Sequence, residues 1–175
     1  KHMPKRAFKR GLNALLPNDI SVLSVDEMPI DFHPRRWGYK KWYRYRWLFR
    51  ESNCPFRRDY VWHVSRQIDT ESMVEAACQF EGTHEFSAFR ARGCSAVMTH
   101  RTIEKCRMHS VSEDEWVLDV FGNGFLRHQV RIMAGTLLEI GLGRIRACDV
   151  PMIIQAGERN RAGQTAPAKG LILMQ

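Results

Sequence analysis

The chain contains no hydrophobic run long enough to cross a membrane and no secretory leader at its start. A membrane-spanning helix needs roughly 18 or more consecutive apolar residues, and no segment approaches that length. The first residues also lack the basic, apolar and cleavage-site regions of a signal peptide. We therefore expect a protein that acts away from membranes.

The cysteines do not form a pattern that would bind zinc or build a disulfide framework. Their number is odd and no two of them form a C-x-x-C pair, which argues against both kinds of site. We expect them to be reduced, in a cytoplasmic compartment, and to pack as small hydrophobic side chains. They are Cys54, Cys78, Cys94, Cys106 and Cys148.

Several common catalytic motifs are missing as well. The sequence has no Walker motif, no H-E-x-x-H and no nucleophile elbow. The segment GNGFLR at 122–127 begins like a dinucleotide-binding loop but lacks its third glycine. These absences argue against P-loop nucleotide hydrolysis, zinc peptidase chemistry and α/β-hydrolase chemistry.

Acidic residues are scarce in the first part of the chain. Residues 1–50 contain twelve Lys and Arg against four acidic residues, whereas 51–175 contain fifteen of each, so the whole net charge of +8 lies in 1–50. Of the 27 basic residues, 20 are arginine, whose forked guanidinium suits phosphate contacts. The uneven charge suggests one surface that faces a polyanion.

The hydrophobic patterns indicate an α+β fold with a largely antiparallel mixed sheet and packed helices. At 44% hydrophobic residues, the chain can build the core of one ordinary domain. We expect helices at 5–18, 70–81, 124–141 and 147–157, the second of them capped by Asp69 or Thr70. We expect strands at 20–26, 41–50, 60–64, 101–110, 116–121 and 170–174.

Two basic stretches are candidates for nucleic-acid contact. Residues 33–50 contain seven Lys or Arg, seven aromatic residues and no carboxylate, a mixture that suits phosphates and unstacked bases. The alternative is a strand whose aromatic side chains fill the core, but the one-sided charge favours nucleic acid. In 84–103, Arg90, Arg92, His100 and Arg101 could track a nucleic-acid backbone or belong to a solvated loop.

Arg131 lies within the apolar pattern of the helix expected at 124–141. A half-buried arginine needs a carboxylate or phosphate partner, and Asp119 and Glu139 are the local candidates. The alternative is an arginine at the edge of the apolar stripe that extends to water. Helical spacing alone slightly favours this second interpretation.

A series of collinear blocks over roughly 5–173 resembles the tRNA pseudouridine synthase A family. The blocks are RGLNALLPNDI (10–20), DFHPR (31–35), K-x-Y-x-Y (41–45), PF-R-x-x-YVWH (55–63), G-x-H-x-F-x-AFR (82–90), GC (93–94), RTI (101–103), GNGFLRH-x-VRIMAGTLLE-x-G (122–141) and AG-x-TAPA-x-GL-x-L (162–173). The resemblance implies an isomerase that converts uridines of the tRNA anticodon stem and loop to pseudouridine, without a cofactor or a metal.

The resemblance also implies a homodimer of two-lobed protomers with a basic cleft between the lobes. The catalytic aspartate of the family lies in an R-T-D-A-G-V-H motif of the N-terminal lobe, and this motif is absent from the sequence. We therefore interpret residues 1–175 as the C-terminal lobe, which binds RNA, forms one wall of the active site and is inactive alone.

The family motifs assign roles to individual residues. Tyr43 matches the tyrosine that stacks on the target base, Arg131 matches the partner of the catalytic aspartate, and Leu171 matches the apolar wall of the uracil pocket. Two segments match tRNA contacts: Arg35, Arg36, Trp37, Gly38 and Tyr39, and Gly93, Cys94, Ser95, Ala96 and Val97. Arg36 and Trp37 depart from the usual family pattern and make the first segment more basic.

Two alternatives belong to other functional classes. One is a non-catalytic RNA-binding module that retains the surface of the fold without its chemistry. The other is a basic DNA-binding domain, which would bind duplex DNA at least as well as tRNA at matched salt.

The basic first segment leads to a prediction about affinity. Changing Arg35 and Arg36 to Ala should weaken tRNA binding and flatten its dependence on salt, because fewer counterions are released from the phosphates. Filter binding of tRNA across a salt series measures both effects. An unchanged salt slope would locate the tRNA surface elsewhere.

Overall fold

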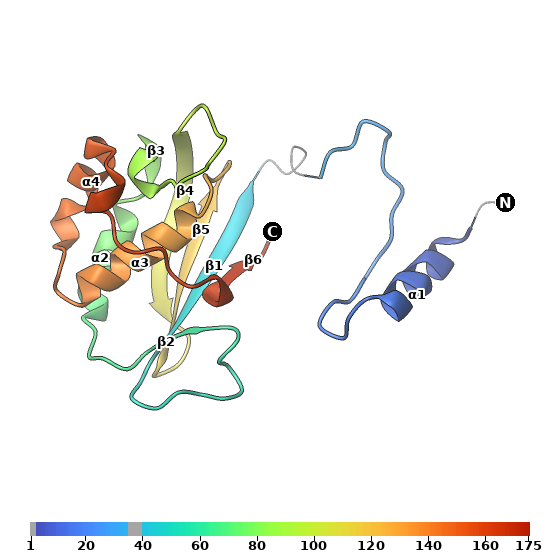
Figure 1. Ribbon diagram of the computed structural model, residues 1–175, viewed down its shortest axis with the longest axis horizontal. Helices are drawn as coiled ribbons and strands as arrows, with labels where there is room; N and C mark the ends of the chain where they lie inside the picture. Colours follow the sequence, from blue (N-terminus) through green and yellow to red (C-terminus); the bar gives the residue numbers. More distant parts are fainter. Residues whose placement is uncertain (1–2, 35–39) are drawn as a thin grey trace. The chain divides into compact units, whose positions relative to one another are not determined.

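The computed structural model describes residues 3–34 and 40–175 of the chain. The chain divides into two compact units, residues 1–38 and 39–175. The first contains one helix, α1 (Lys5–Leu15), and the second contains a six-stranded sheet with the other helices (Figure 1). Within the described ranges, every helix is too short or too polar to traverse a lipid bilayer.

In the first unit, α1 ends earlier than the sequence pattern suggested. Leu16 is extended, with ψ of 149°, because the ring of the following Pro17 disfavours helical backbone. The strand expected at 20–26 is wrong, since this segment has no regular structure. Its backbone is instead held at Val22, whose N–H and C=O both bond the side chain of Asn13, at 2.7 and 3.0 Å.

The second unit is built on a mixed, mostly antiparallel sheet with strand order β2-β1-β5-β4-β3. The strands are β1 (Lys41–Phe49), β2 (Trp62–Val64), β3 (Gly82–Glu85), β4 (His100–Ser110), β5 (Glu115–Gly122) and β6 (Leu171–Leu173). β2 runs parallel to the second half of β1, and β6 pairs antiparallel with its first half. The predicted fold class is confirmed, although β3 was not expected.

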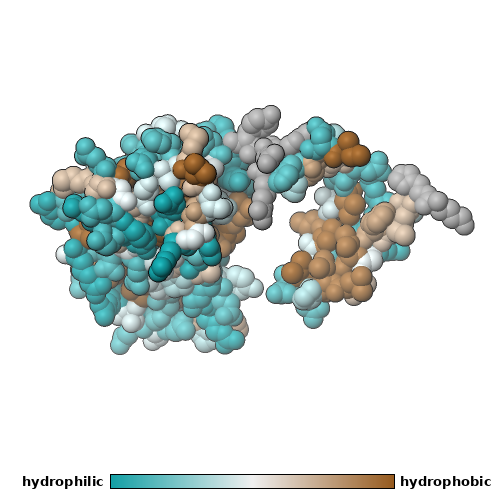
Figure 2. Space-filling view, turned by 45° about the horizontal axis from the view of Figure 1, so that its top comes forward, coloured by the Kyte–Doolittle hydropathy of each residue, from teal (hydrophilic) through white to brown (hydrophobic). Residues whose placement is uncertain are grey.

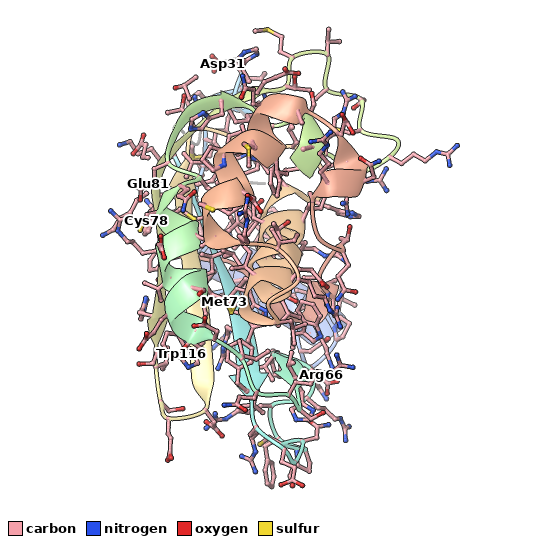
Figure 3. All side chains as sticks on the ribbon, turned by 90° about the vertical axis from the view of Figure 1, so that its left-hand side faces the viewer. Asp31, Arg66, Met73, Cys78, Glu81 and Trp116 are labelled. Carbon is pink, nitrogen blue, oxygen red and sulfur yellow. The ribbon has the colours of Figure 1, made fainter. Side chains whose placement is uncertain are left out.

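Three α-helices lie on one face of the sheet: α2 (Thr70–Cys78), α3 (Gln129–Gly141) and α4 (Val150–Ala156) (Figure 1). Asp69 caps α2 by accepting from the Ser72 N–H, as predicted. Met73 projects from α2 against α3, where a Cβ at Gly141 would lie 2.6 Å from its sulfur (Figure 3). All five cysteines are free.

β1 separates its side chains between two very different environments. Tyr45 and Trp47 are fully buried between the sheet and the helices, with their ring centroids 5.0 Å apart. For these two residues the structure agrees with the alternative interpretation of 33–50, a strand whose aromatic side chains fill the core.

The opposite face of β1 carries arginines that pair with acidic residues of β5. Arg44 makes a bidentate pair with Asp119 at 2.8 Å and Arg46 bonds Glu115 at 2.7 Å. Arg50 bonds Asp114 at 3.1 Å. The positive excess of residues 1–50 is therefore partly neutralised by residues that are distant in the sequence.

Asp119 should contribute to stability in a pH-dependent way. Burial raises the pKa of this carboxyl, but the hydrogen bonds from Arg44 and Trp42 outweigh burial and hold the pKa below its ordinary value. Asp119→Asn should lower the free energy of unfolding by about 1–3 kcal/mol near neutral pH. Because the folded-state pKa is depressed, this contribution is present above about pH 4 and is lost as the pH falls through the folded-state value.

Urea denaturation of wild type and Asp119→Asn at several pH values measures this difference. Asp149→Asn, which disrupts the exposed pair with Arg146, is the control and should cost clearly less than Asp119→Asn, because solvent screens this pair. A cost for Asp119→Asn that persists unchanged well below pH 3.9, the ordinary Asp pKa, would contradict the assignment.

Candidate active-site hollow

A hollow of about 350 Å³ lies where β1, β6 and the start of α3 meet. Tyr43 of β1, Arg131 of α3 and Leu171 of β6 all line it. The structure therefore brings together the three residues to which the family motifs assign base-binding or catalytic roles. β6 pairs directly with β1, so Leu171 stands opposite Tyr45 in the register.

The start of α3 shapes one side of this hollow. The helix begins at Gln129, and the prediction that it would begin at 124 is wrong. Its first turn is replaced by a tight bend in which the Gln129 side chain accepts from the Leu126 N–H at 2.8 Å. His128 has φ of 60°, the left-handed region that non-glycine residues rarely adopt, and this bend leaves Phe125 free to pack edge-on against Tyr43 at 5.1 Å.

Arg131 is held by the backbone of the segment that leads to β6. Its Nε donates to the carbonyl oxygen of Ala166 at 2.6 Å, and the Ala166 N–H donates to the Arg131 carbonyl at 3.0 Å. No described residue pairs with its two terminal nitrogens. Arg131 is therefore fixed in direction but keeps a fork of donors for a carboxylate or phosphate.

The local partners proposed for Arg131 are wrong. Asp119 accepts from Arg44 and Trp42 on the opposite face of the sheet. Glu139 accepts from Arg144 at 2.8 Å at the far end of α3. Arg131 itself is half-buried, and its Nε is bonded to the protein backbone.

The loop containing 93–97 is bonded to the bend that precedes α3. Arg127 donates to the carbonyl of Gly93 at 3.2 Å, and the Ala91 N–H donates to the carbonyl of Arg127 at 3.1 Å. Backbone hydrogen bonds from Ala96 and Arg127 lower the pKa of the Cys94 thiol. Residues 93–97 therefore lie close to the hollow, whereas 35–39 lie outside the described residues.

Charge near the hollow is positive. Arg90, Arg101 and Arg127 donate to backbone carbonyls, and no carboxylate in the described part of the chain forms an ion pair with them. Burial, with the charges of Arg131 and Arg127, lowers the pKa of His128. This setting favours an anionic ligand.

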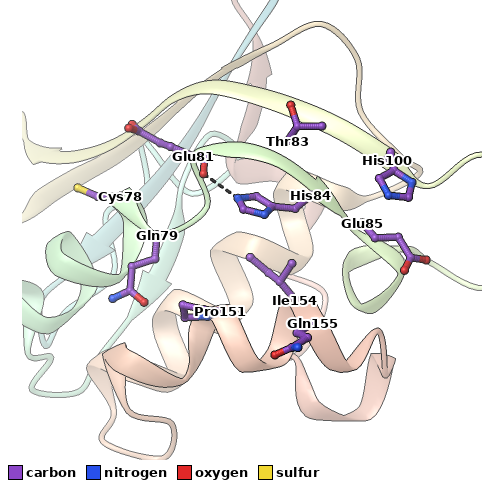
Figure 4. Close-up of a pocket in the computed structure, with 10 residues that line it drawn as sticks. All are labelled: Cys78, Gln79, Glu81, Thr83, His84, Glu85, His100, Pro151, Ile154 and Gln155. Atoms are coloured by element: carbon purple, nitrogen blue, oxygen red, sulfur yellow. Dashed lines mark hydrogen bonds between the residues drawn. The ribbon is translucent and has the colours of Figure 1, made fainter.

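A larger hollow of about 580 Å³ lies between α2, β3 and α4 and contains none of the predicted site residues (Figure 4). Two of its polar groups are engaged: His84 bonds the Glu81 carbonyl at 2.7 Å, and Glu85 accepts from Ser87 and Thr99. No set of three or more His, Cys, Asp or Glu in 3–34 and 40–175 is arranged to hold a metal ion. We therefore assign the candidate site to the smaller hollow.

Sequence reasoning missed two residues of the site. Phe125 was assigned to a helix and gave no signal for its contact with Tyr43. Gln129 is 1% exposed, and its Nε2 is a buried donor without a partner among the described residues. The only sequence signal for either is a position close to the Gly-Asn-Gly segment that interrupts the helical pattern.

The comparisons with known proteins agree with this arrangement. A family model described as tRNA pseudouridine synthase matches residues 76–175, more than half of the chain. This chain belongs to the tRNA pseudouridine synthase family. The resemblance to this family that the sequence motifs indicated is therefore confirmed.

Relatives named tRNA pseudouridine synthase A resemble the synthase chain over almost its whole length. Those of Citrifermentans bemidjiense, Myxococcus xanthus and Acetivibrio thermocellus are 43%, 44% and 45% identical to it. The alignments cover 100%, 98% and 99% of the chain and 70%, 64% and 70% of the respective relatives. The chain therefore spans about two thirds of the length of these relatives.

The close approach between α3 and the segment before β6 generates a stability prediction. A Cβ at Gly135 would lie 1.7 Å from the Gln164 carbonyl oxygen, and one at Gly163 would lie 2.6 Å from the Gly135 oxygen. Gly135→Ala should therefore lower the free energy of unfolding by about 1–3 kcal/mol or more. Gly124→Ala, whose Cβ would meet only Arg101 side-chain atoms at 3.9 Å, is the matched control.

Urea denaturation of the two variants tests this prediction, and near-ultraviolet circular dichroism reports on the packing of the aromatic residues. Equal stability of Gly135→Ala and Gly124→Ala would mean that α3 and the 162–166 segment separate easily. The hollow would then not depend on their contact.

Proposed function

We propose that the protein to which this chain belongs isomerises uridine to pseudouridine in the anticodon stem and loop of tRNA. The observation that carries the proposal is the single hollow lined by Tyr43, Arg131 and Leu171. The reaction breaks the bond from C1′ to N1, forms a bond from C1′ to C5 and releases the hydrogen of C5. A stacked base hides these atoms, so the uridine must leave the helix and enter a pocket.

In this proposal each of the three residues has a separate task. Tyr43 stacks on the extruded base, with its ring oriented by Phe125. Leu171 forms an apolar wall of the pocket. The free fork of Arg131 pairs with an aspartate supplied from outside this chain, keeps it ionised in a water-poor site and aims it at C1′ or C6.

We further propose that the chain is the C-terminal part of a two-lobed protomer, with residues 39–175 as one lobe. The apolar side chains of residues 3–34 support this proposal. Phe8 and Leu12 of α1 are about half exposed and Leu15 and Leu23 are more than four fifths exposed, and Figure 2 shows hydrophobic surface gathered over this unit. Such a surface fits burial against the lobe that supplies the aspartate.

The tRNA surface is proposed to include residues 35–39 and 93–97. Arg90, Arg101 and Arg127, which have no carboxylate partner in the described part of the chain, support phosphate contact near the second segment. The proposed enzyme is a cytoplasmic homodimer that requires no cofactor and no metal, as the family resemblance implies.

Tritium release from tRNA labelled at C5 of uridine tests the activity, because the C5 hydrogen is lost during isomerisation. The 175-residue chain alone should release no tritium, since it lacks the aspartate motif. Supplying an N-terminal lobe with the R-T-D-A-G-V-H motif should restore release, and Arg131→Lys should reduce it because lysine lacks the forked donor geometry.

The outcomes of this assay separate the alternatives. Robust release by the chain alone would overturn the proposed dependence on an external aspartate. Specific tRNA binding without release, even in the presence of the added lobe, would favour the non-catalytic RNA-binding module.

A further inference from the structure

A second hollow lies at the end of the sheet where β1 begins, β5 ends and β4 begins. The antiparallel register brings these three ends together, since Gly122 pairs with Lys41 on one side and with Ile103 on the other (Figure 1). The hollow has a volume of about 380 Å³ and is lined by Lys41, His100, Arg101, Asn123, Gly124 and Phe125. We refer to it as the basic hollow.

The lining of the basic hollow offers hydrogen-bond donors and no carboxylate. Arg101 uses one terminal nitrogen to bond the carbonyls of Met98 and His100, at 3.0 and 2.6 Å, and its other nitrogens have no partner in the described part of the chain. The Asn123 side-chain oxygen accepts from the Thr102 N–H at 3.3 Å, and its amide nitrogen has no partner among the described residues. Such a set of donors matches the oxygens of a phosphate group.

The neighbours of the basic hollow leave Lys41 and Arg101 without a carboxylate ion-pair partner among the described residues. Lys40, adjacent in the sequence, pairs with Glu104 at 2.8 Å, whereas Lys41 forms no ion pair with a described residue. Glu85 stands opposite His100 across the β3–β4 pair and interacts with it electrostatically, while its carboxylate accepts from Ser87 and Thr99 at 2.6 and 3.0 Å. The arginines on the outer face of β1, by contrast, are matched with acids of β5.

One side chain connects the basic hollow with the candidate active site. Phe125 lines both hollows, and its ring packs edge-on against Tyr43 at 5.1 Å. The two hollows therefore share Phe125 as a common lining residue. A nucleotide whose base stacks on Tyr43 would carry its sugar and phosphate past this ring.

We infer that Lys41, His100, Arg101 and Asn123 bind a backbone phosphate next to the uridine that enters the hollow beside Tyr43. This inference rests on the proposed function and adds a contact outside 35–39 and 93–97. Phosphate contacts fix the register of a nucleic acid on a protein. The basic hollow would therefore select which loop nucleotide reaches the active site.

Binding of an anticodon stem-loop RNA by the 175-residue chain, followed by fluorescence anisotropy over a salt series, tests the inference. Lys41→Gln and Arg101→Gln should each weaken binding and reduce the slope of log affinity against log salt by about 0.7–1, the loss of one phosphate contact. Lys40→Gln is the matched control, since it removes the same charge at the adjacent residue. Its slope should equal that of wild type.

Stem-loops with a single uncharged methylphosphonate linkage identify the phosphate. One linkage beside a loop uridine should weaken binding of wild type but leave binding of Arg101→Gln unchanged. Equal sensitivity of wild type and Arg101→Gln at every linkage would overturn the inference, as would equal salt slopes for Lys41→Gln and Lys40→Gln. A further outcome is that inorganic phosphate competes with the RNA for wild type but fails to compete for Arg101→Gln. That result would assign the site to phosphate in general and overturn its specificity for the RNA backbone.

A duplex DNA of equal length, measured at the same salt, separates this inference from the proposed function. A preference for the stem-loop with no effect specific to Lys41 or Arg101 would overturn only the phosphate contact. Absence of any preference for the stem-loop would overturn the proposed function and the inference together.

Discussion

The absence of a side chain at Gly135 allows the backbone of residues 162–166 to lie directly on α3, and the candidate site depends on this contact. Gly163 makes the same approach from the other side, and its N–H donates to the Thr136 hydroxyl at 2.9 Å. Arg131 and Ala166 then exchange two hydrogen bonds. The chain that follows this contact is positioned so that β6 pairs with β1. This pairing brings Leu171 to the hollow that Tyr43 also lines.

This contact also explains why Arg131 can be half-buried without an acidic partner. Its Nε is satisfied by a carbonyl that the fold fixes in place, so only the terminal nitrogens depend on solvent or a ligand. A guanidinium anchored at one end loses little conformational freedom when it binds a carboxylate, because its direction is already set. The same anchoring would make Arg131→Lys a poor substitute, since a lysine ammonium cannot donate to Ala166 and to a second partner in the same plane.

Hydrophobic periodicity predicted the elements that form the core, and it failed where the backbone is fixed by individual contacts. β1, α2, β4 and β5 have regular apolar patterns, and their positions agree with the prediction to within a few residues. Residues 124–128 continue the apolar pattern of α3, but the Gln129 side chain and the left-handed His128 redirect the backbone there. Residues 20–26 have strand-forming side chains, yet a strand needs a neighbour, and none pairs with them in the described residues.

The candidate site could be found from the sequence only through the family motifs. Spacing placed Arg131 near the apolar stripe but suggested Asp119 and Glu139 as its partners, which are paired with other arginines.

The net charge of residues 1–50 was misleading for a related reason. Arginines 44, 46 and 50, three of the twelve basic residues of 1–50, are paired with acids of β5 and the turn before it, whereas Lys41, Arg101 and Arg131 form no ion pair with a described residue. Only the register of the sheet reveals which charges remain available.

The position of Phe125 suggests how recognition and chemistry depend on each other in this fold. The ring orients Tyr43 on one side and forms a wall of the basic hollow on the other. A phosphate held at Lys41 and Arg101 would therefore restrict the nucleotide to the position in which its base reaches Tyr43. Extruding a base costs a few kcal/mol of stacking and pairing energy, and charge-assisted contacts to the adjacent backbone can offset that cost without reading the sequence. Selection of the base would then be left to the hollow that contains Tyr43, Leu171 and the fork of Arg131.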